Sequence, residues 1–261
     1  MHPVPIWDRL TFERKDTGIQ LSCSDPILPV NSKNLVYRAA ELFLTTAGIR
    51  DGIRIHLEKN VPTAAGLGGG SGDAAITLLA VNELFDAVLP TEKLVELAAS
   101  LGSDIPFFLQ NRPAIGVGRG EQIKSLAPFE CLRGKSIILV HPGFGISTPW
   151  AYQQMSNFPD AQNGKPGRAE KLAMLLAKGD LLAAGKEFYN SLEAPALKKY
   201  PLLVLFQEFF REHGAITTLM SGSGSATFAI VNSQPTAEKI LEKFKSHFGE
   251  KMWLAAVPLS I

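Results

Sequence analysis

The alternation of apolar and polar residues predicts a chain that mixes strands with helices. Residues 52–61 (GIRIHLEKNV) alternate with a period of two, as a half-buried strand does. Residues 35–47 instead carry apolar side chains at helical spacing, with Asn34 as the candidate N-cap and Gly48 as the stop. The apolar run at 136–142 (SIILVHP) is typical of a strand buried on both faces.

The same signals give the remaining elements and a boundary. The further predicted strands are a pair at 7–15 and 18–24 that turns at 16–18, two strands within 216–232, and a last strand at 252–258. The further predicted helices cover 73–85, 168–190, 201–213 and 235–248, and another is capped by Thr91 and ends at Gly102. A short element is predicted at 103–109. The polar stretch 160–167 is predicted to be a surface loop. Strand and helix signals restart after 130–135, which predicts two α+β domains, 1–133 and 134–261.

Composition narrows the class of protein. Hydrophobic residues make up 46% of the chain and charged residues 20%, and the net charge is +1 with no basic stripe, so binding to nucleic acid or anionic lipid has no support. No apolar run approaches the roughly 20 residues of a membrane helix, and the first residues do not resemble a leader peptide. Cys23 and Cys131 are far apart, suit a reducing cytosol and are expected to be buried. The five histidines form no recognisable ligand set. These features predict a cytoplasmic enzyme or binding domain.

A glycine-rich window at 66–72 carries the first candidate chemistry. A predicted strand ends just before it and a helix follows, so backbone amides at the helix start would face the loop and attract phosphate. Glycine allows the chain to approach such a ligand closely. The window lacks the Gly-Lys-Ser/Thr ending of a Walker loop and the third glycine of the dinucleotide fingerprint. The alternative is that these glycines only turn the chain.

The window resembles the second motif of the GHMP kinases. In that motif a proline, here Pro62, is followed by three residues and then by Gly-Leu-Gly, here 66–68. The triple glycine with Ser71 and Asp73 is similar to one branch, which phosphorylates 4-diphosphocytidyl-2-C-methyl-D-erythritol. Gly72 stands where that branch usually has a second serine, so one hydroxyl toward the phosphates or metal is absent. The resemblance implies the ATP-binding set Asn34, Pro62, Thr63, Ala64, Ala65, Gly66, Leu67, Gly68, Gly69, Gly70, Ser71, Gly72 and Asp73.

Two further motifs follow in the order of the family. The stretch LGSDIPFF (101–108) implies that Asp104 is the catalytic base, the alternative being that Asp104 or Ser103 only caps a helix. The stretch MSGSGSATFAIV (220–231) is similar to the third motif, although Gly-Ser-Gly-Ser can be an ordinary hairpin turn. The implied substrate-binding residues are Thr148, Tyr152, Gly222, Ser223 and Gly224. Tyr152 would stack on the cytosine ring, and the alternative role for this residue is packing in a core. Asn34 would lie near the adenine, and its alternative role is that of a helix cap.

The resemblance covers essentially the whole chain and implies a fold and a reaction. The fold is the two-domain α+β GHMP kinase fold, with a ribosomal-protein-S5-domain-2-like N-terminal domain and a ferredoxin-like C-terminal domain. The reaction transfers the γ-phosphoryl of ATP, with Mg²⁺, to the 2-hydroxyl of the methylerythritol moiety. The partner is a small cytidine-diphosphate substrate, without nucleic acid or membrane, and the protein is expected to be a monomer or weak dimer. The alternatives are a homoserine-type or mevalonate-type kinase, or a non-catalytic nucleotide-binding relic.

The family pattern also contains an opening segment that the chain does not match. Its members begin with a Pro-Ala-Lys-Ile-Asn strand and an Asp-Gly-Tyr-His segment, whereas MHPVPIWDRL is similar to the portion just after them. Either the natural protein starts upstream of Met1, which we favour, or the chain is genuinely short. A missing strand would expose the sheet edge near 7–15. We therefore expect residues 1–261 by themselves to be poorly soluble and nearly inactive.

Overall fold

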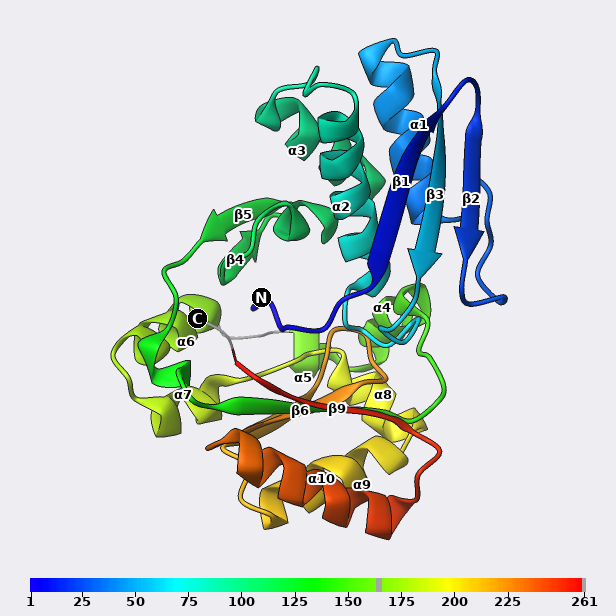
Figure 1. The fold of residues 1–261 in the computed structure, drawn as a ribbon. Coiled ribbons are helices and arrows are strands. Elements are labelled where there is room, and N and C mark those ends of the chain that lie inside the picture. The colour runs from blue at the N-terminus through cyan, green and yellow to red at the C-terminus, as the bar shows by residue number, and fades with distance from the viewer. Residues whose placement is uncertain (163–165, 260–261) are drawn as a thin grey trace. The chain divides into compact units, whose positions relative to one another are not determined.

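The computed structural model describes residues 1–162 and 166–259 and divides into two compact units (Figure 1). The first unit comprises residues 1–61 and 68–127, and the second comprises 62–67 and the chain from Pro128 onward. The short segment 62–67, which carries the start of the glycine window, thus groups with the second unit. Residues 163–165, within the predicted 160–167 loop, lie outside the described residues, and α5 (Pro159–Gln162) occupies its start.

The first unit contains a three-stranded sheet in the order β1-β3-β2, formed by β1 (Arg9–Lys15), β2 (Ile19–Cys23) and β3 (Gly52–Glu58). Strand β3 pairs antiparallel with β1 and parallel with β2, so the prediction that 7–15 and 18–24 pair with each other is wrong. The turn at 16–18 passes so close to the start of β3 that a Cβ on Gly52 would lie 2.2 Å from the Thr17 carbonyl carbon. The alternating apolar residues of β3 are fully buried, and their burial favours the central position for this strand.

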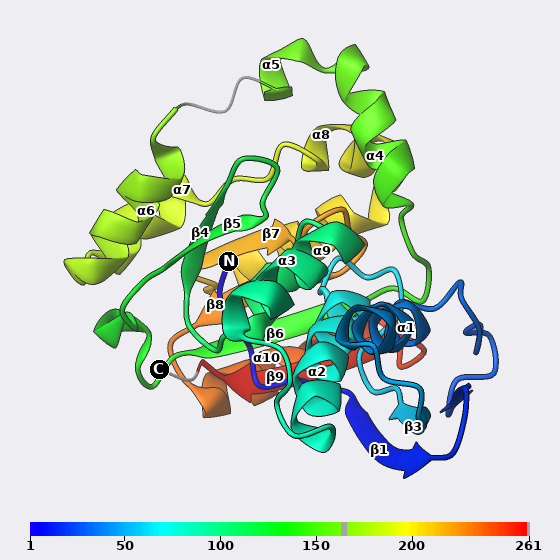
Figure 2. The same cartoon turned by 90° about the horizontal axis from the view of Figure 1, so that it is seen from above.

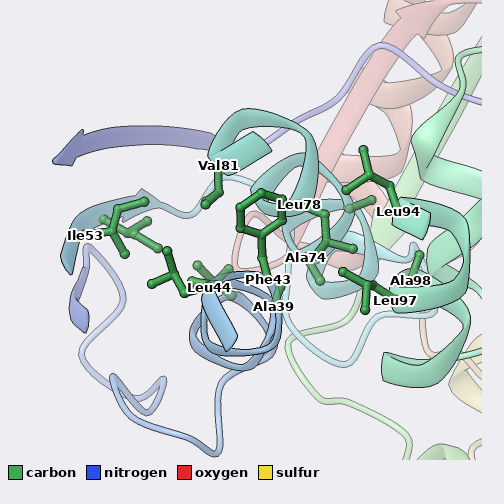
Figure 3. Close-up of a cluster of buried hydrophobic side chains, with 14 of the residues drawn as sticks. Ala39, Phe43, Leu44, Ile53, Ala74, Leu78, Val81, Leu94, Leu97 and Ala98 are labelled. Carbon is green, nitrogen blue, oxygen red and sulfur yellow. The ribbon is translucent and has the colours of Figure 1, made fainter. Parts of the chain in front are cut away.

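Three helices and β3 enclose the core of this unit. They are α1 (Leu35–Ala47), α2 (Gly69–Leu84) and α3 (Thr91–Leu101), and side chains from all three converge with Ile53 in Figure 3. The Asn34 side chain accepts a hydrogen bond from the Val36 amide at 2.9 Å, and Gly48 ends α1 with φ 66°, which confirms both predicted helix signals.

Two predicted helix starts were wrong. The α2 helix begins at Gly69 rather than at residue 73, so most of the glycines of the window lie in its first turn. The N-cap of α3 is Pro90, and Thr91 is the first helical residue. A 3₁₀ helix, η1 (Ile105–Leu109), follows α3 and corresponds to the predicted short element. A hairpin of β4 (Ala114–Val117) and β5 (Gln122–Ser125) was not predicted.

The second unit is built on a four-stranded antiparallel sheet in the order β7-β8-β6-β9. Its strands are β6 (Ser136–His141), β7 (Thr217–Met220), β8 (Thr227–Val231) and β9 (Trp253–Pro258). Helices α9 (Leu202–Glu212) and α10 (Gln234–Phe248) pack together on one face of it (Figures 1 and 2). Every residue of β6 is buried, as its apolar run predicted. The two-layer α+β architecture of this unit agrees with the sequence prediction.

Shorter helices complete the second unit. They are η2 (Glu130–Leu132), α4 (Thr148–Gln154), η3 (Met155–Asn157), α6 (Arg168–Ala177), α7 (Leu181–Glu187) and α8 (Glu193–Lys199). A single helix over 168–190 is therefore wrong: Gly179, with φ 81°, separates α6 from α7, and Phe188 is extended. Residues 188–192 lie between α7 and α8, and the Glu193 amide donates to the Asn190 carbonyl at 3.1 Å, which forms a turn there.

Some composition-based expectations can also be compared with the structure. Cys23 and Cys131 are both half-buried rather than fully buried. Among the described residues, no group of histidine, cysteine, aspartate or glutamate side chains is arranged to hold a metal ion. A search of the same residues found no helix with the length and hydropathy needed to cross a membrane.

Candidate active site

The amino terminus of α2 presents free backbone amides in the first unit. The first backbone hydrogen bond of the helix runs from the Gly72 amide to the Gly68 carbonyl, at 2.8 Å, so the amides of residues 69–71 precede the helical ladder. Gly68 has φ 72°, and a Cβ there would lie 2.5 Å from the Phe108 ring. Only glycine fits this position, and the resulting turn directs three N–H groups and the positive end of the helix dipole toward any bound anion.

The preceding segment belongs to the second unit and is bonded to its glycine turn. The Ser221 hydroxyl donates to the Gly66 carbonyl at 2.8 Å, and the Ala226 amide donates to the Ala65 carbonyl at 2.9 Å. A Cβ on Gly66 would lie 2.0 Å from the Ser221 carbonyl oxygen, so this glycine is required by close backbone approach. The opening part of the second motif, residues 62–67, is therefore hydrogen-bonded to the third motif within the second unit.

The substrate residues predicted on the second unit also come together. The hydroxyls of Thr148, at the start of α4, and Ser223, in the glycine turn, are hydrogen-bonded at 2.8 Å. Gly222 and Gly224 both have positive φ, at 53° and 87°. Tyr152 lies one turn after Thr148 and is 64% exposed, so the alternative that it packs in a core is wrong. An exposed ring on this helix is free to stack on a planar ligand.

Asp104 lies in the first unit at the entrance to η1. It is exposed, its side chain makes no capping bond to the helix, and no hydrogen bond or ion pair of its carboxylate is found within the described residues. The alternative of a helix cap is therefore wrong for this side chain. The following helix places Phe108 against Gly68 and Gly72, so the element that begins at Asp104 packs on the start of α2.

Asn34 lies differently from the other predicted ATP residues. Its side chain uses Oδ1 for the Val36 amide and Nδ2 for the Pro29 carbonyl, at 2.9 and 2.8 Å, and the residue is 9% exposed. Its observed contacts are those of a structural cap. The Ser71 side chain has no hydrogen bond among those found in the described part of the chain, and Thr63 and Ala64 are exposed in the loop.

A buried charged cluster under the glycine loop was missed by the sequence prediction. Lys59 Nζ forms ion pairs with Asp8 and, at 3.0 Å, with Asp73 Oδ2. The other Asp8 oxygen accepts hydrogen bonds from the amides of Asn60, at 2.6 Å, and Val61, at 2.8 Å. The cluster thus connects the end of β3, the segment before β1 and the first turns of α2. No local sequence pattern indicated it, because Asp8 and Lys59 are 51 positions apart.

Burial governs the electrostatics of this cluster. It raises the pKa of Asp73 to about 7, because removal from water disfavours the carboxylate more strongly than the nearby Lys59 stabilises it, and the neighbouring Asp8 adds repulsion. Burial acts to lower the pKa of Lys59, but the combined attraction of Asp73 and Asp8 exceeds that effect and raises it. Asp73 was predicted to bind ATP, but its carboxylate is paired with Lys59, so its observed contact is an ion pair within the protein at the start of α2.

Comparison with known proteins agrees with this architecture. Residues 34–112 match the GHMP kinases N terminal domain, and residues 172–250 match the GHMP kinases C terminal domain. The chain belongs to the GHMP kinase family.

Within the family, several curated proteins similar to this chain share one name. The chain is 38% identical over 256 residues to a 4-diphosphocytidyl-2-C-methyl-D-erythritol kinase of Synechococcus sp. (strain JA-3-3Ab), covering 96% of this chain and 82% of that protein. A crystal structure of 4-(cytidine 5'-diphospho)-2C-methyl-D-erythritol kinase matches with 34% identity and a TM-score of 0.74, covering 96% of this chain and 86% of the other. A homoserine kinase from Cytophaga hutchinsonii has a TM-score of 0.79 at 21% identity, with 97% and 86% of the two chains covered, and this likeness concerns the fold.

Proposed function

We propose that this GHMP kinase transfers the γ-phosphoryl group of ATP to the 2-hydroxyl of 4-diphosphocytidyl-2-C-methyl-D-erythritol. Family membership supports ATP as the donor, and the relatives' names support the acceptor. The observation that carries the proposal is the junction between Ser221 and Gly66, with the neighbouring bond from Ala226 to Ala65. It joins the turn that bears Ser223 to residues 65 and 66, at the opening of the glycine motif, and phosphoryl transfer depends on such fixed positions of the binding groups.

In the proposed reaction, the substrate's 2-hydroxyl oxygen forms a bond to the γ-phosphorus of ATP. The bond from that phosphorus to the β,γ-bridging oxygen breaks, ADP leaves, and the hydroxyl proton passes to the Asp104 carboxylate. Asp104 suits this task because its oxygens are exposed and have no hydrogen-bonding partner found in the described residues. The amides of residues 69–71 would bind phosphate oxygens, while Thr148 and Ser223 would orient the substrate.

Magnesium is part of the proposal, and the donor set is compatible with it. Mg²⁺ in kinases is held mainly by phosphate oxygens and water, with one or two protein ligands. This fits a site in which the described residues contain no cluster of three metal-binding side chains. The Ser71 hydroxyl, at the start of α2, is the candidate protein ligand. When bound, the ion would neutralise charge on the phosphates.

The test is ADP release with a panel of acceptors. It uses residues 1–261 and the same chain extended by a family-type opening strand with its Tyr-His segment, each with the cytidine-diphosphate substrate, homoserine, mevalonate or no acceptor. We expect the extended chain to release ADP in the presence of the cytidine-diphosphate substrate, and NMR should show a phosphomonoester at the 2-position of that substrate. Turnover of homoserine or mevalonate instead would replace the substrate assignment. Stabilisation by ATP without transfer in either form would indicate a nucleotide-binding relic.

A further inference from the structure

A short turn outside all of the sequence motifs holds the second glycine turn at its base. The Nδ2 group of Asn190 donates to the Met220 carbonyl at 2.8 Å and to the Gly222 carbonyl at 2.7 Å. Its Oδ1 accepts from the Leu192 amide at 3.0 Å, which fixes the orientation of the side-chain amide. Both donors of this side chain are therefore used on the backbone that leads into the turn.

The residue that follows this turn, Glu193, also contacts the end of β7. Glu193, the first residue of α8, accepts hydrogen bonds at Oε1 from the Met220 amide, at 2.7 Å, and from Gln207 Nε2, at 2.6 Å. Burial raises the pKa of this carboxyl. Met220, the last residue of β7, consequently has its carbonyl held by Asn190 and its amide held by Glu193.

The glycine turn is held by its own backbone bonds, such as that from the Gly224 amide to the Ser221 carbonyl at 2.8 Å, and by bonds from outside it, among them those of Asn190. Gly222 and Gly224 have positive φ, and a chain with two such glycines has many alternative conformations when nothing restrains it. Ser223 lies between them and reaches the Thr148 hydroxyl. A shift of the Gly222 carbonyl would move this serine directly, because the two residues are adjacent.

We propose that Asn190 is a positioning residue for phosphoryl transfer, with Glu193 supporting it. Asn190 sets the path of residues 220–224, and thereby the place of Ser223 against Thr148. This role rests on the proposed function, in which that serine contacts the acceptor substrate. The hydrogen bonds found for the Asn190 side chain in the described residues are its two to the turn and the one that it accepts from the Leu192 amide.

The decisive variant is Asn190→Asp, which keeps the size and the Oδ1 acceptor but replaces the donating amide by a second oxygen facing two carbonyls. Asn190→Ser serves as a second variant that removes the donors without adding charge. The matched control is Asn157→Asp, an exposed asparagine of the same unit whose side-chain amide donates to the Gln154 side chain at 3.3 Å. All three substitutions are made in the form of the enzyme, residues 1–261 or the extended chain, that transfers the phosphoryl group.

Two readouts are measured on each variant. The first is amide hydrogen exchange, which does not require a substrate: peptides covering 220–226 should exchange faster in the Asn190 variants, while α9 and α10 and the control remain unchanged. The second is kinetics: kcat/KM for the acceptor should fall about 10–100-fold through misplacement, with the KM for ATP unchanged.

The outcomes separate this inference from the proposed function. If the unsubstituted enzyme transfers no phosphoryl group to the cytidine-diphosphate acceptor, the proposed function fails, and hydrogen exchange still decides the role of Asn190. If both Asn190 variants exchange as the control does, or keep its kcat/KM, the positioning role is overturned. It is equally overturned if both lose their folded state, because Asn190 would then be a general folding element.

Discussion

Lys59 Nζ lies 3.0 Å from Asp73 Oδ2, with only 7% of the lysine side chain and 6% of the aspartate side chain exposed. Asp8 joins them from the segment before β1, and its own side chain is 1% exposed. Two carboxylates thus share one ammonium group in a buried place directly under the start of α2. A Cβ on Gly69 would lie 3.4 Å from Lys59 Nζ, so the cluster is next to the helix start that carries the proposed phosphate-binding amides.

Removing the lysine should be strongly destabilising. Lys59→Met leaves Asp8 and Asp73 buried without a countercharge, and breaking a buried pair in this way costs about 3–5 kcal/mol. Urea unfolding measures the change. The control is Lys93→Met, which loses an exposed pair with Glu96 and should change stability by less than about 1 kcal/mol. Equal effects of the two substitutions would mean that the cluster contributes nothing beyond a surface pair.

The raised pKa of Asp73, about 7, makes stability depend on pH in a defined direction. In the unfolded chain this carboxyl has an ordinary aspartate pKa of about 3.9, so between that pH and about 7 the folded state holds a proton that the unfolded state has released. The free energy of unfolding should therefore decrease as pH rises through this window, and Asp73's stabilising contribution is complete only below the unfolded pKa. Above about pH 7 the dependence ends.

The pH prediction is tested by substitution. Asp73→Asn should flatten the fall in stability between about pH 4 and pH 7, measured by urea unfolding at several pH values. Asp51→Asn, at an exposed aspartate, should leave the profile unchanged. Profiles of the same slope for Asp73→Asn and the parent chain would assign the pH dependence to other groups.

The sequence predicted elements whose signals are local and failed where pairing is distant. Asn34 and Gly48 mark the ends of α1 because a cap bond and a positive φ act within a few residues. The pairing of β1 with β2 was wrong because β3 lies between them, and its place depends on burying alternate residues against helices far along the chain. No nearby residue carries that information.

The same distinction applies to the candidate site. The glycine motifs were visible because glycine is favoured by close backbone approach, as at Gly66, and by a positive φ, as at Gly68. Asp8 and Lys59 are 51 positions apart, and neither one has a pattern around it that indicates a pair. Asn190 was hidden by the expectation of a continuous helix over 168–190, whereas α7 ends at Glu187. Side-chain bonds between distant turns require the folded coordinates.

Asp104 provides a test of the chemistry. Asp104→Asn keeps the size and the exposed position but cannot take the hydroxyl proton, so kcat should fall by about a hundredfold or more. The melting temperature should stay unchanged, because the described contacts include no hydrogen bond from this side chain. Initial rates of ADP release at saturating ATP and acceptor measure the effect, with Asp51→Asn as the exposed control. An unaltered kcat would remove Asp104 from the reaction.

At Gly72 we predict a substitution that strengthens ATP binding. A Cβ at Gly72 would lie 3.4 Å from the Phe108 ring, an ordinary contact, and the residue lies within α2. Gly72→Ser should therefore fold, and its hydroxyl, close to the amides proposed to bind phosphate, should lower the KM for ATP. The same change at Gly68 should fail, because a Cβ there would lie 2.5 Å from that ring at φ 72°. Thermal unfolding and ATP titration of the two variants check this pair. A KM for ATP that stays the same or rises in a stable Gly72→Ser variant would show that this position does not face the nucleotide.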